Sequence, residues 1–518
     1  MAMKNNEDIP MKTTTKLSAF GFFTLTAAML MSADEYPAFA QSGLLATGFL
    51  ILAGLLWFLP VALVSAQMAT MPGWGDGGIY TWVKGSLGQR SGFIAVFFQW
   101  LQITVNFITM IYFIIGVLAF AVDMPALNSN PWLKLALFLL IYWVMTAIQL
   151  RGINGTDKVV KWTFLFGIVL PALILLGLSV TYLLEGHHVQ FVTNFAANRT
   201  TLTTHFSLTS VVPFVLAFTG IEASAAYVNN LRNARRNYPL ILLILVLFAI
   251  TLDSFGGLSV AAVVPAKALS LNQGVIEAIN KMVHSVTVGT FTPVVKGIGL
   301  LMAIGMLGEI SSWIVGPVRS LLVTAEDEIL PARFNQVNKQ QVPVHLVFLQ
   351  GGLVSIIAFI LTIGFGGNNA AFSMAMSLTV MLYLVMYILM FIAFLNLVRK
   401  GKMAAATFRI PGNKVVHLLL GLLGLGSSMV VFTSTFLPTA SSHLSTGVYA
   451  AIMSLFFLTV LGITLWLYSR RRTQSTTKTW HIRHRHLDEV PRFTQMQGRG
   501  EHVLEQTEQS KTKQPTSP

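Results

Sequence analysis

Two hydrophobic segments of this chain carry carboxylates at positions where a membrane-spanning helix is normally apolar. One apolar run leads into Asp34, Glu35 and Pro37, and another leads into Gly220 and Glu222. A charged side chain at the bilayer centre costs about 2.5 to 3.5 kcal/mol even on the more lenient insertion scales, so such residues are rare and usually have a function. We interpret these two segments as parts of a ligand-binding site.

Each of the two segments includes a residue that interrupts a helix. Pro37 lacks the N–H that would continue the hydrogen-bond ladder, and Gly220 permits backbone conformations that other residues avoid. An unwound helix exposes N–H groups at the start of one half and C=O groups at the end of the other. These ends suit the carboxylate and the ammonium of an α-amino acid, as in the broken helices of secondary transporters. We therefore predict that Asp34, Glu35, Gly220 and Glu222 bind substrate.

Three later segments add polar residues at membrane depth. Glu309 precedes Trp313 by one helical turn, and Tyr383 precedes Tyr387 by one turn, so each pair shares a helix face. We predict that these four residues line the substrate path. The alternative interpretations are a structural hydrogen bond for Glu309 and ordinary packing or anchoring for the three aromatic residues. Asp253, beside glycines, is interpreted as a tight helix contact or hydrogen-bond site.

Composition sets the class of protein that must position these residues. Of 518 residues, 54% are hydrophobic and only 10% charged, and mean hydropathy is +0.68, which excludes a soluble multidomain chain. Apolar stretches of about 20 residues, the length that crosses a bilayer as a helix, recur along the sequence. We predict an all-α membrane protein with twelve spans: Leu17–Phe39, Leu44–Thr70, Ser91–Val122, Trp132–Leu150, Val160–Leu184, Thr209–Val228, Pro239–Val264, Val294–Ala325, Pro343–Ile363, Ala371–Val398, Val415–Leu437 and Gly447–Leu467.

The spacing of the two interruptions predicts the architecture. They fall in the first and sixth spans, so each repeat holds five spans, and an odd number inverts the second copy in the membrane. We expect a 5+5 inverted repeat with broken helices 1 and 6, followed by two C-terminal helices. The expected organisation is a cytoplasmic segment at 1–16, a transporter domain at 17–468 and a cytoplasmic tail at 469–518.

Basic residues predict the orientation. The net charge of +14 could indicate nucleic-acid binding, but 29 of the 34 Lys and Arg residues fall on one side if the N-terminus is cytoplasmic. This is the positive-inside distribution of a membrane protein, so no nucleic-acid partner is expected. Both termini are predicted to be cytoplasmic, in a bacterial plasma membrane. The outward basic residues are Lys134, Arg199, Lys267, Lys281 and Lys296.

Histidines gather in the tail. His481, His484, His486 and His502 are interleaved with arginines, among them Arg499. Histidine changes charge between neutral and mildly acidic pH, which favours a pH-sensitive plug on the cytoplasmic mouth. A basic strip attracted to anionic membrane lipid is an equally good interpretation.

Several strings resemble a known family. The chain is similar to the bacterial glutamate/γ-aminobutyrate antiporters of the amino acid, polyamine and organocation superfamily, over essentially all twelve spans. The strings that carry this resemblance are GFFTLTAAMLMSADEYPAFA, LLWFLPVALVSAQMATMPGW, GIEASAAYVNNLRNARRNYPL, GEISSWIVGPVRSLL and GFGGNNAAFSMAMSLTVMLYLVMY.

The resemblance implies exchange of external glutamate for internal γ-aminobutyrate, in partnership with a cytoplasmic glutamate decarboxylase, as an acid-resistance system. It also implies a C-terminal plug that opens in acid, and Arg499 to His502 resemble it. The substrate-path residues that it implies are Glu35, Gly220, Glu222, Glu309, Trp313, Tyr383 and Tyr387. One position departs from the family pattern VYEYP, because Asp34 stands where an aromatic residue is usual.

Other functional classes have little support. There is no cysteine, no Walker-type nucleotide loop and no metal-ligand or catalytic spacing, so an enzyme, an ATP-driven pump and a bound cofactor are not expected. The alternatives that stay open are another amino acid/amine exchanger or permease of the same superfamily, and a channel or receptor built on a transporter scaffold.

Overall fold

The computed structural model describes residues 18–475, except 75–77, 152–161, 164, 195–196, 199, 201–206, 223–230, 288–291, 328, 341, 440 and 443. By its contacts the chain divides into Met1–Leu465 and Trp466–Pro518. Of the second unit, only the end of a helix is described, where the guanidinium of Arg470 lies 5.1 Å from the ring centroid of Trp466.

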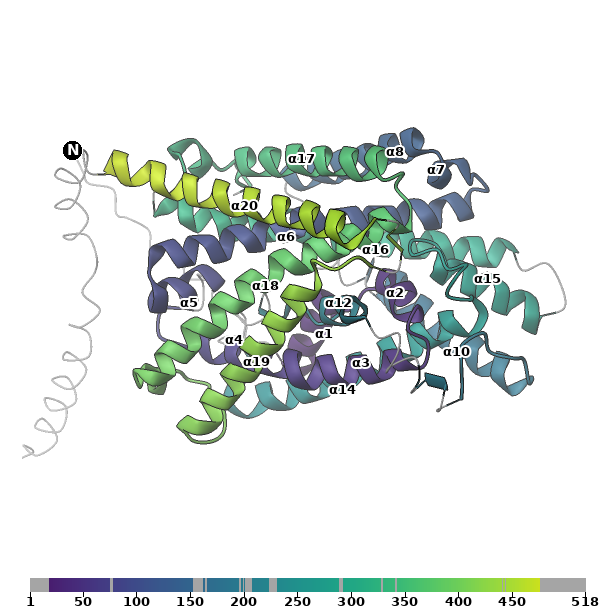
Figure 1. Cartoon of the computed structure of the whole chain (residues 1–518), viewed down its shortest axis with the longest axis horizontal. Coiled ribbons are helices and arrows are strands. Elements are labelled where there is room, and N and C mark those ends of the chain that lie inside the picture. The colour runs from purple at the N-terminus through teal and green to yellow at the C-terminus, as the bar shows by residue number, and fades with distance from the viewer. Residues whose placement is uncertain are drawn as a thin grey trace, which may run out of the picture. The chain divides into compact units, whose positions relative to one another are not determined.

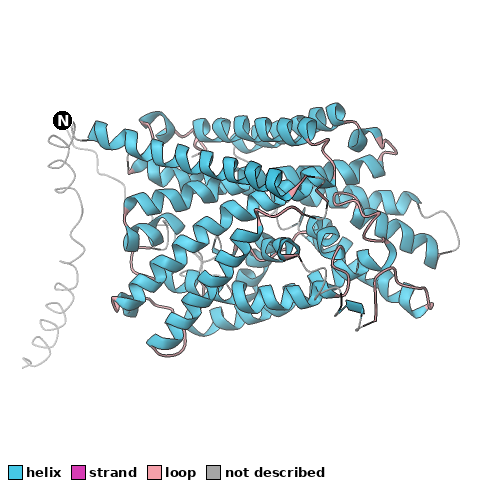
Figure 2. Ribbon diagram, in the orientation of Figure 1, coloured by secondary structure: helices cyan, strands magenta, loops and turns pink. Residues whose placement is uncertain are grey.

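The described part of the chain is helical (Figure 2), with Val337 and Pro343 forming an isolated bridge instead of a strand. Ten helices within it are long and apolar enough to cross a membrane. The all-α membrane fold is thus confirmed, while the twelve crossings and the inverted repeat stay predictions. The ten are α3–η2–α4 (Leu45–Ala69), α6 (Gln89–Ala121), α8 (Pro131–Leu150), η3–α10 (Leu165–Leu184), α14 (Ala234–Val263), α16 (Thr292–Glu326), α17–η7 (Val344–Gly364), α18 (Asn369–Arg399), α19 (Lys414–Ser434) and α20 (Thr446–Ser475).

The first predicted span is interrupted. Helix α1 (Ala19–Leu30) ends where Met31 and Ser32 become extended, and a single 3₁₀ turn at Ala33–Glu35 leads into the short helix α2 (Tyr36–Ala40). Pro37 occupies the first turn of α2, where its missing N–H costs least. The break therefore lies just before the proline, with the carboxylates inside it.

The sixth predicted span is interrupted as well. A 3₁₀ turn at Leu208–Val211 and the short helix α12 (Val212–Leu216) give way to turns that end at Gly220. Gly220 has φ of +105°, a conformation that only glycine adopts without strain. In Figure 1, α2 and α12 lie near the middle of the helical bundle, among much longer helices.

Three long helices contain a π-helical turn that the sequence pattern did not predict. These turns lie at Gly54–Phe58, Leu165–Val169 and Ile360–Gly364. The first two immediately precede α4 (Leu59–Ala69) and α10 (Leu170–Leu184), each with a proline at its start. Because proline leaves the carbonyl four residues earlier without a donor, the helix widens locally to satisfy it.

Two glycine contacts fix the packing around the first break. A Cβ at Gly256 would lie 2.6 Å from the ring of Tyr36, and a Cβ at Gly257 would lie 2.7 Å from the Cβ of Phe39. Small residues allow membrane helices to approach closely, so α14 can press directly against α2. The tight helix contact is thus made by the two glycines near Asp253, while the role of Asp253 itself stays a prediction.

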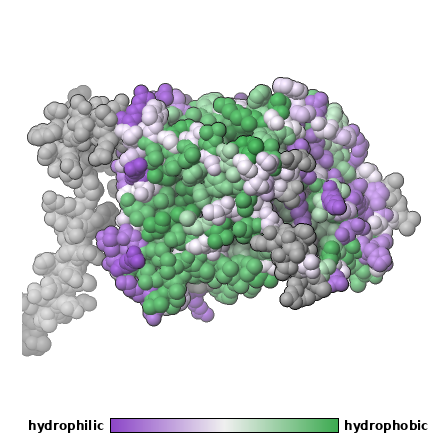
Figure 3. Space-filling view, in the orientation of Figure 1, coloured by the Kyte–Doolittle hydropathy of each residue, from purple (hydrophilic) through white to green (hydrophobic). Residues whose placement is uncertain are grey.

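The outer surface suits a lipid environment. Large apolar side chains such as Leu184, Ile356, Leu419 and Leu455 are exposed on different helices. The face in Figure 3 shows a broad hydrophobic region, with hydrophilic residues towards its two ends. A continuous apolar surface of this extent would be unfavourable in water, and the chain is a multi-pass membrane protein.

A contact between Gly305 in α16 and Gly167 provides a stability test. A Cβ at Gly305 would lie 2.6 Å from backbone atoms of Gly167. We expect Gly305→Ala to cost about 1–3 kcal/mol through overpacking and to lower the melting temperature of the purified protein by several degrees. Gly297→Ala, on the same helix with nothing within 4 Å of the new Cβ, is the control. Equal melting temperatures for the two variants would contradict this packing.

Candidate functional site

The two interrupted segments pack against each other. The rings of Phe39 in α2 and Phe214 in α12 are stacked with centroids 5.2 Å apart, and Phe49 lies at the same distance from Phe214. Aromatic contacts of this kind hold the two short helices in place where regular hydrogen bonding ends. The predicted site residues of the first and sixth spans thus belong to one region of the protein.

Glu222 is the centre of one polar cluster in this region. Its side chain is 3% exposed. The hydroxyl of Tyr383 donates to its Oε1 at 2.7 Å, Gln99 Nε2 donates to the same oxygen at 3.2 Å, and the hydroxyl of Tyr387 donates to Oε2. Three donors from α6 and α18 thus replace the water that this carboxylate loses on burial.

Tyr387 also supports the break itself. Its hydroxyl oxygen accepts a hydrogen bond from the backbone N–H of Gly220 at 3.3 Å. Its ring meets Trp57 edge to face at 5.0 Å and lies 5.1 Å from that of Tyr383, one turn earlier on α18. One tyrosine therefore satisfies the freed backbone of the sixth span and holds its carboxylate.

A second cluster of carboxylates surrounds the first break. Ser32 Oγ donates to Glu309 Oε2 at 3.1 Å, which brings α16 to the interrupted backbone. Asp34, Asp253 and Glu309 lie close enough to Glu35 to interact with it electrostatically. Asp34 is 6% exposed and Asp253 is 4% exposed. Such a group of acids suits a cation such as an ammonium, or protons that relieve the repulsion.

For some of the predicted residues the structure shows no contact with these clusters, and their roles stay predictions. Trp313 is half-buried on α16, and no hydrogen bond or ring contact to it is found in the described part of the chain. No hydrogen bond joins Glu222 to Glu35 or Glu309 in that part either. The predicted tail residues lie outside the described residues: His481, His484, His486, Arg499 and His502.

Two site residues were not predicted from the sequence. Gln99 lies within the 33-residue helix α6, where nothing distinguishes it from Gln102 before the fold is known. Ser32 stands next to the predicted carboxylates but carries no charge to draw attention. The signal available for Ser32 was its place directly before the break.

This combination defines a class of protein: a helical membrane protein with a polar site between interrupted helices. Residues 17–478 match the amino acid permease family. The chain belongs to that family, and the family resemblance of its motifs is confirmed.

Relatives with known names cover most of the chain. A glutamate/gamma-aminobutyrate antiporter of Lactococcus lactis subsp. lactis strain IL1403 is 41% identical over 490 residues, which are 94% of this chain and 97% of that protein. The protein of the same name from Lactococcus lactis subsp. cremoris strain MG1363 is 43% identical over 444 residues, 86% of this chain and 88% of its own.

A solved structure shares the fold. The crystal structure of the Eremococcus coleocola manganese transporter matches with a TM-score of 0.51 and 11% sequence identity, covering 91% of this chain and 97% of that chain. The likeness at this identity concerns the course of the helices alone.

The two tyrosines make a graded test of the Glu222 cluster. Tyr387→Phe removes a donor to Glu222 and the acceptor of the Gly220 N–H, whereas Tyr383→Phe removes one donor only. Losing a hydrogen bond to a buried charge costs about 1.5–3 kcal/mol, so we expect Tyr387→Phe to slow amino acid uptake by proteoliposomes about tenfold or more. Tyr383→Phe should slow uptake less than Tyr387→Phe does.

Tyr142→Phe is the matched control for this series. Its hydroxyl accepts a hydrogen bond from Gln350 at 3.4 Å, and these residues belong to α8 and α17 and not to the interrupted spans. It should leave uptake close to that of the parent protein. A loss in Tyr142→Phe equal to that in Tyr387→Phe would indicate a general effect of removing buried hydroxyls and would count against the site.

Proposed function

We propose that this protein exchanges extracellular glutamate for intracellular γ-aminobutyrate. The observation that carries the proposal is the pair of relatives with that name, 41% and 43% identical over most of their length. Identity at this level extends across the interrupted spans and the helices that surround them. The function is therefore proposed from the whole transport domain and not from one motif.

The geometry of the two clusters supports this substrate pair. Glutamate and γ-aminobutyrate both present an ammonium and a carboxylate. The acids around the first break suit the ammonium, and the N–H groups at the start of a half-helix suit a carboxylate. On this basis we assign substrate binding to five residues: Asp34, Glu35, Gly220, Glu222 and Glu309. Tyr383 and Tyr387 support Glu222 in this proposal. Trp313 lines the substrate path.

The proposed mechanism is alternating access driven by the two substrate gradients, without ATP or catalysis. In the proposed topology both termini are cytoplasmic, as the distribution of basic residues indicates. Decarboxylation of imported glutamate to γ-aminobutyrate consumes one proton and releases carbon dioxide. Exchange coupled to a cytoplasmic glutamate decarboxylase would therefore export acid equivalents and support acid resistance.

Counterflow in proteoliposomes tests the substrate pair. Vesicles loaded with γ-aminobutyrate should take up labelled glutamate at about pH 5, near the ordinary pKa of its side chain. Vesicles without internal substrate should take up little. Glutamate uptake that ignores internal γ-aminobutyrate would refute the exchange.

A panel of unlabelled competitors separates the alternative exchanger. If the protein instead pairs a basic amino acid with its decarboxylation product, that pair should outcompete glutamate in the same vesicles. A channel or receptor would give currents or signals without stoichiometric counterflow.

The tail provides a separate test of pH control. If residues 469–518 plug the cytoplasmic path, their deletion should raise exchange several-fold at neutral pH and leave it unchanged in acid, where the histidines are already protonated. Exchange is measured across the pH range for both proteins. An unaltered profile would leave the tail as a strip that binds anionic lipid.

A further inference from the structure

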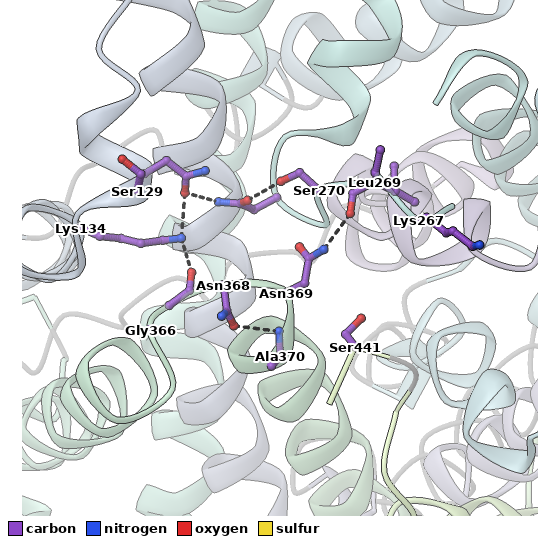
Figure 4. A pocket seen from close by; sticks show the side chains of 14 residues that line it. Ser129, Lys134, Lys267, Leu269, Ser270, Gly366, Asn368, Asn369, Ala370 and Ser441 are labelled. Carbon is purple, nitrogen blue, oxygen red and sulfur yellow. Dashed lines mark hydrogen bonds between the residues drawn. The ribbon is translucent and has the colours of Figure 1, made fainter. Parts of the chain in front are cut away.

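A polar cavity of about 410 Å³ is lined by residues that belong to neither carboxylate cluster. Figure 4 shows its lining side chains. The short helix α7 (Ala126–Ser129), the start of α8 and the segments before α15 (Gly274–Val286), α18 and α20 converge on it. The described residues of its lining include two lysines and several amides and hydroxyls, and none of them carries a carboxylate. The side chains used below are Asn128, Lys134, Lys267, Asn272, Asn369 and Ser441.

Lys134 is a buried cation in the wall of this cavity. It is 1% exposed. Its Nζ donates to Asn128 Oδ1 at 2.8 Å and to the carbonyl oxygen of Gly367, and it lies 4.4 Å from the ring centroid of Tyr112. These partners are all neutral, and in the described part of the chain no carboxylate pairs with it.

Burial without a counter-ion is unusual for lysine. Taking an ammonium out of water costs several kcal/mol, and buried charges in proteins are normally paired with an opposite charge. Neutral oxygens solvate the ammonium but do not neutralise it. The second lysine of the lining, Lys267, is exposed and adds a further positive charge. The cavity therefore favours a small anion.

Hydrogen bonds hold the amide side chains around Lys134 in one arrangement. Asn128 Oδ1 accepts from Asn272 Nδ2 at 2.7 Å as well as from Lys134. Ser270 Oγ donates to Asn272 Oδ1 at 3.0 Å, and Asn369 Nδ2 donates to the carbonyl of Leu269 at 2.7 Å. Such a network fixes the wall before a ligand arrives, which lowers the entropy lost on binding.

The cavity adjoins the outer half of the first interrupted span. Gln41, just after α2, donates from Nε2 to Ser441 Oγ at 3.4 Å. A Cβ at Gly274 would lie 2.8 Å from Leu269 Cδ1 in the lining and 3.1 Å from Pro37 Cβ in α2. In the proposed topology all four converging segments face outwards. A ligand in the cavity therefore lies beside the external approach to the site.

We propose that this cavity is an external receiving site for the carboxylate of an incoming amino acid. It binds the substrate anion before the interrupted helices do, and so raises the local substrate concentration on the outer side. The assignment of the ligand rests on the proposed function, because glutamate carries a net negative charge. Inorganic anions such as chloride share the required chemistry, and the experiment separates the two.

Sided transport tests the proposal with Lys267→Gln in the full-length protein. In right-side-out membrane vesicles we expect the KM for glutamate to rise about threefold or more at low salt, with the maximal rate unchanged, because one attractive charge is lost. In inverted vesicles the KM for glutamate should equal that of the parent protein. Lys281→Gln is the control, since Lys281 is exposed on the predicted outer side but does not line the cavity.

An unchanged KM in Lys267→Gln, or an equal rise in Lys281→Gln or in inverted vesicles, would overturn the proposal. A melting assay of the purified protein distinguishes this failure from failure of the proposed exchange. Sodium glutamate should raise the melting temperature of the parent protein more than that of Lys267→Gln, whether or not exchange occurs. An equal difference with sodium chloride at matched ionic strength would overturn the assignment to a substrate carboxylate.

Discussion

Hydrogen bonding of the backbone inside a hydrocarbon layer is the constraint on which the rest of this structure depends. Water cannot pair N–H and C=O groups there, so a helix can be interrupted only where the protein itself provides partners. The chain interrupts two spans and surrounds both with long helices (Figure 1). The Tyr387 hydroxyl on α18 accepts from the backbone N–H of Gly220, and at the first break the Glu309 carboxylate on α16 accepts from the side-chain hydroxyl of Ser32. Helix α18 thus satisfies a freed backbone group, and both helices bring polar groups to the breaks.

The two breaks solve the problem of a buried carboxylate differently. Glu222 has three neutral donors, so its carboxyl group is held by a fixed set of hydrogen bonds. Glu35 has acidic neighbours that interact with it electrostatically. The first arrangement is stable without a ligand, whereas the second gains from a cation or a proton. This asymmetry supports the proposal that the sixth span positions the substrate and the first binds its ammonium.

Local rules were enough to predict much of this fold. The long apolar stretches, the breaks at Pro37 and Gly220, and the shared face of Tyr383 and Tyr387 all follow from spacing and backbone chemistry within a few residues. What could not be predicted depends on contacts between distant segments. The bond from Gln99 to Glu222 joins residues 123 positions apart, and one amide in a long apolar helix looks like any other. The cavity around Lys134 is lined by four segments that lie far apart in the sequence, so no local pattern reveals it.

The cavity contains two of the few basic residues that lie on the outer side in the proposed topology. Few basic residues are placed outside in the proposed topology, because the positive-inside rule disfavours them. Among them, Lys296 is paired with Asp123, and Lys281 interacts with Glu277 on the same helix. The two that line the cavity, Lys134 and Lys267, have no such acidic partner in the described residues. We propose that an anionic substrate neutralises the charge of these lysines. It would do so beside the first interrupted span, where it binds next.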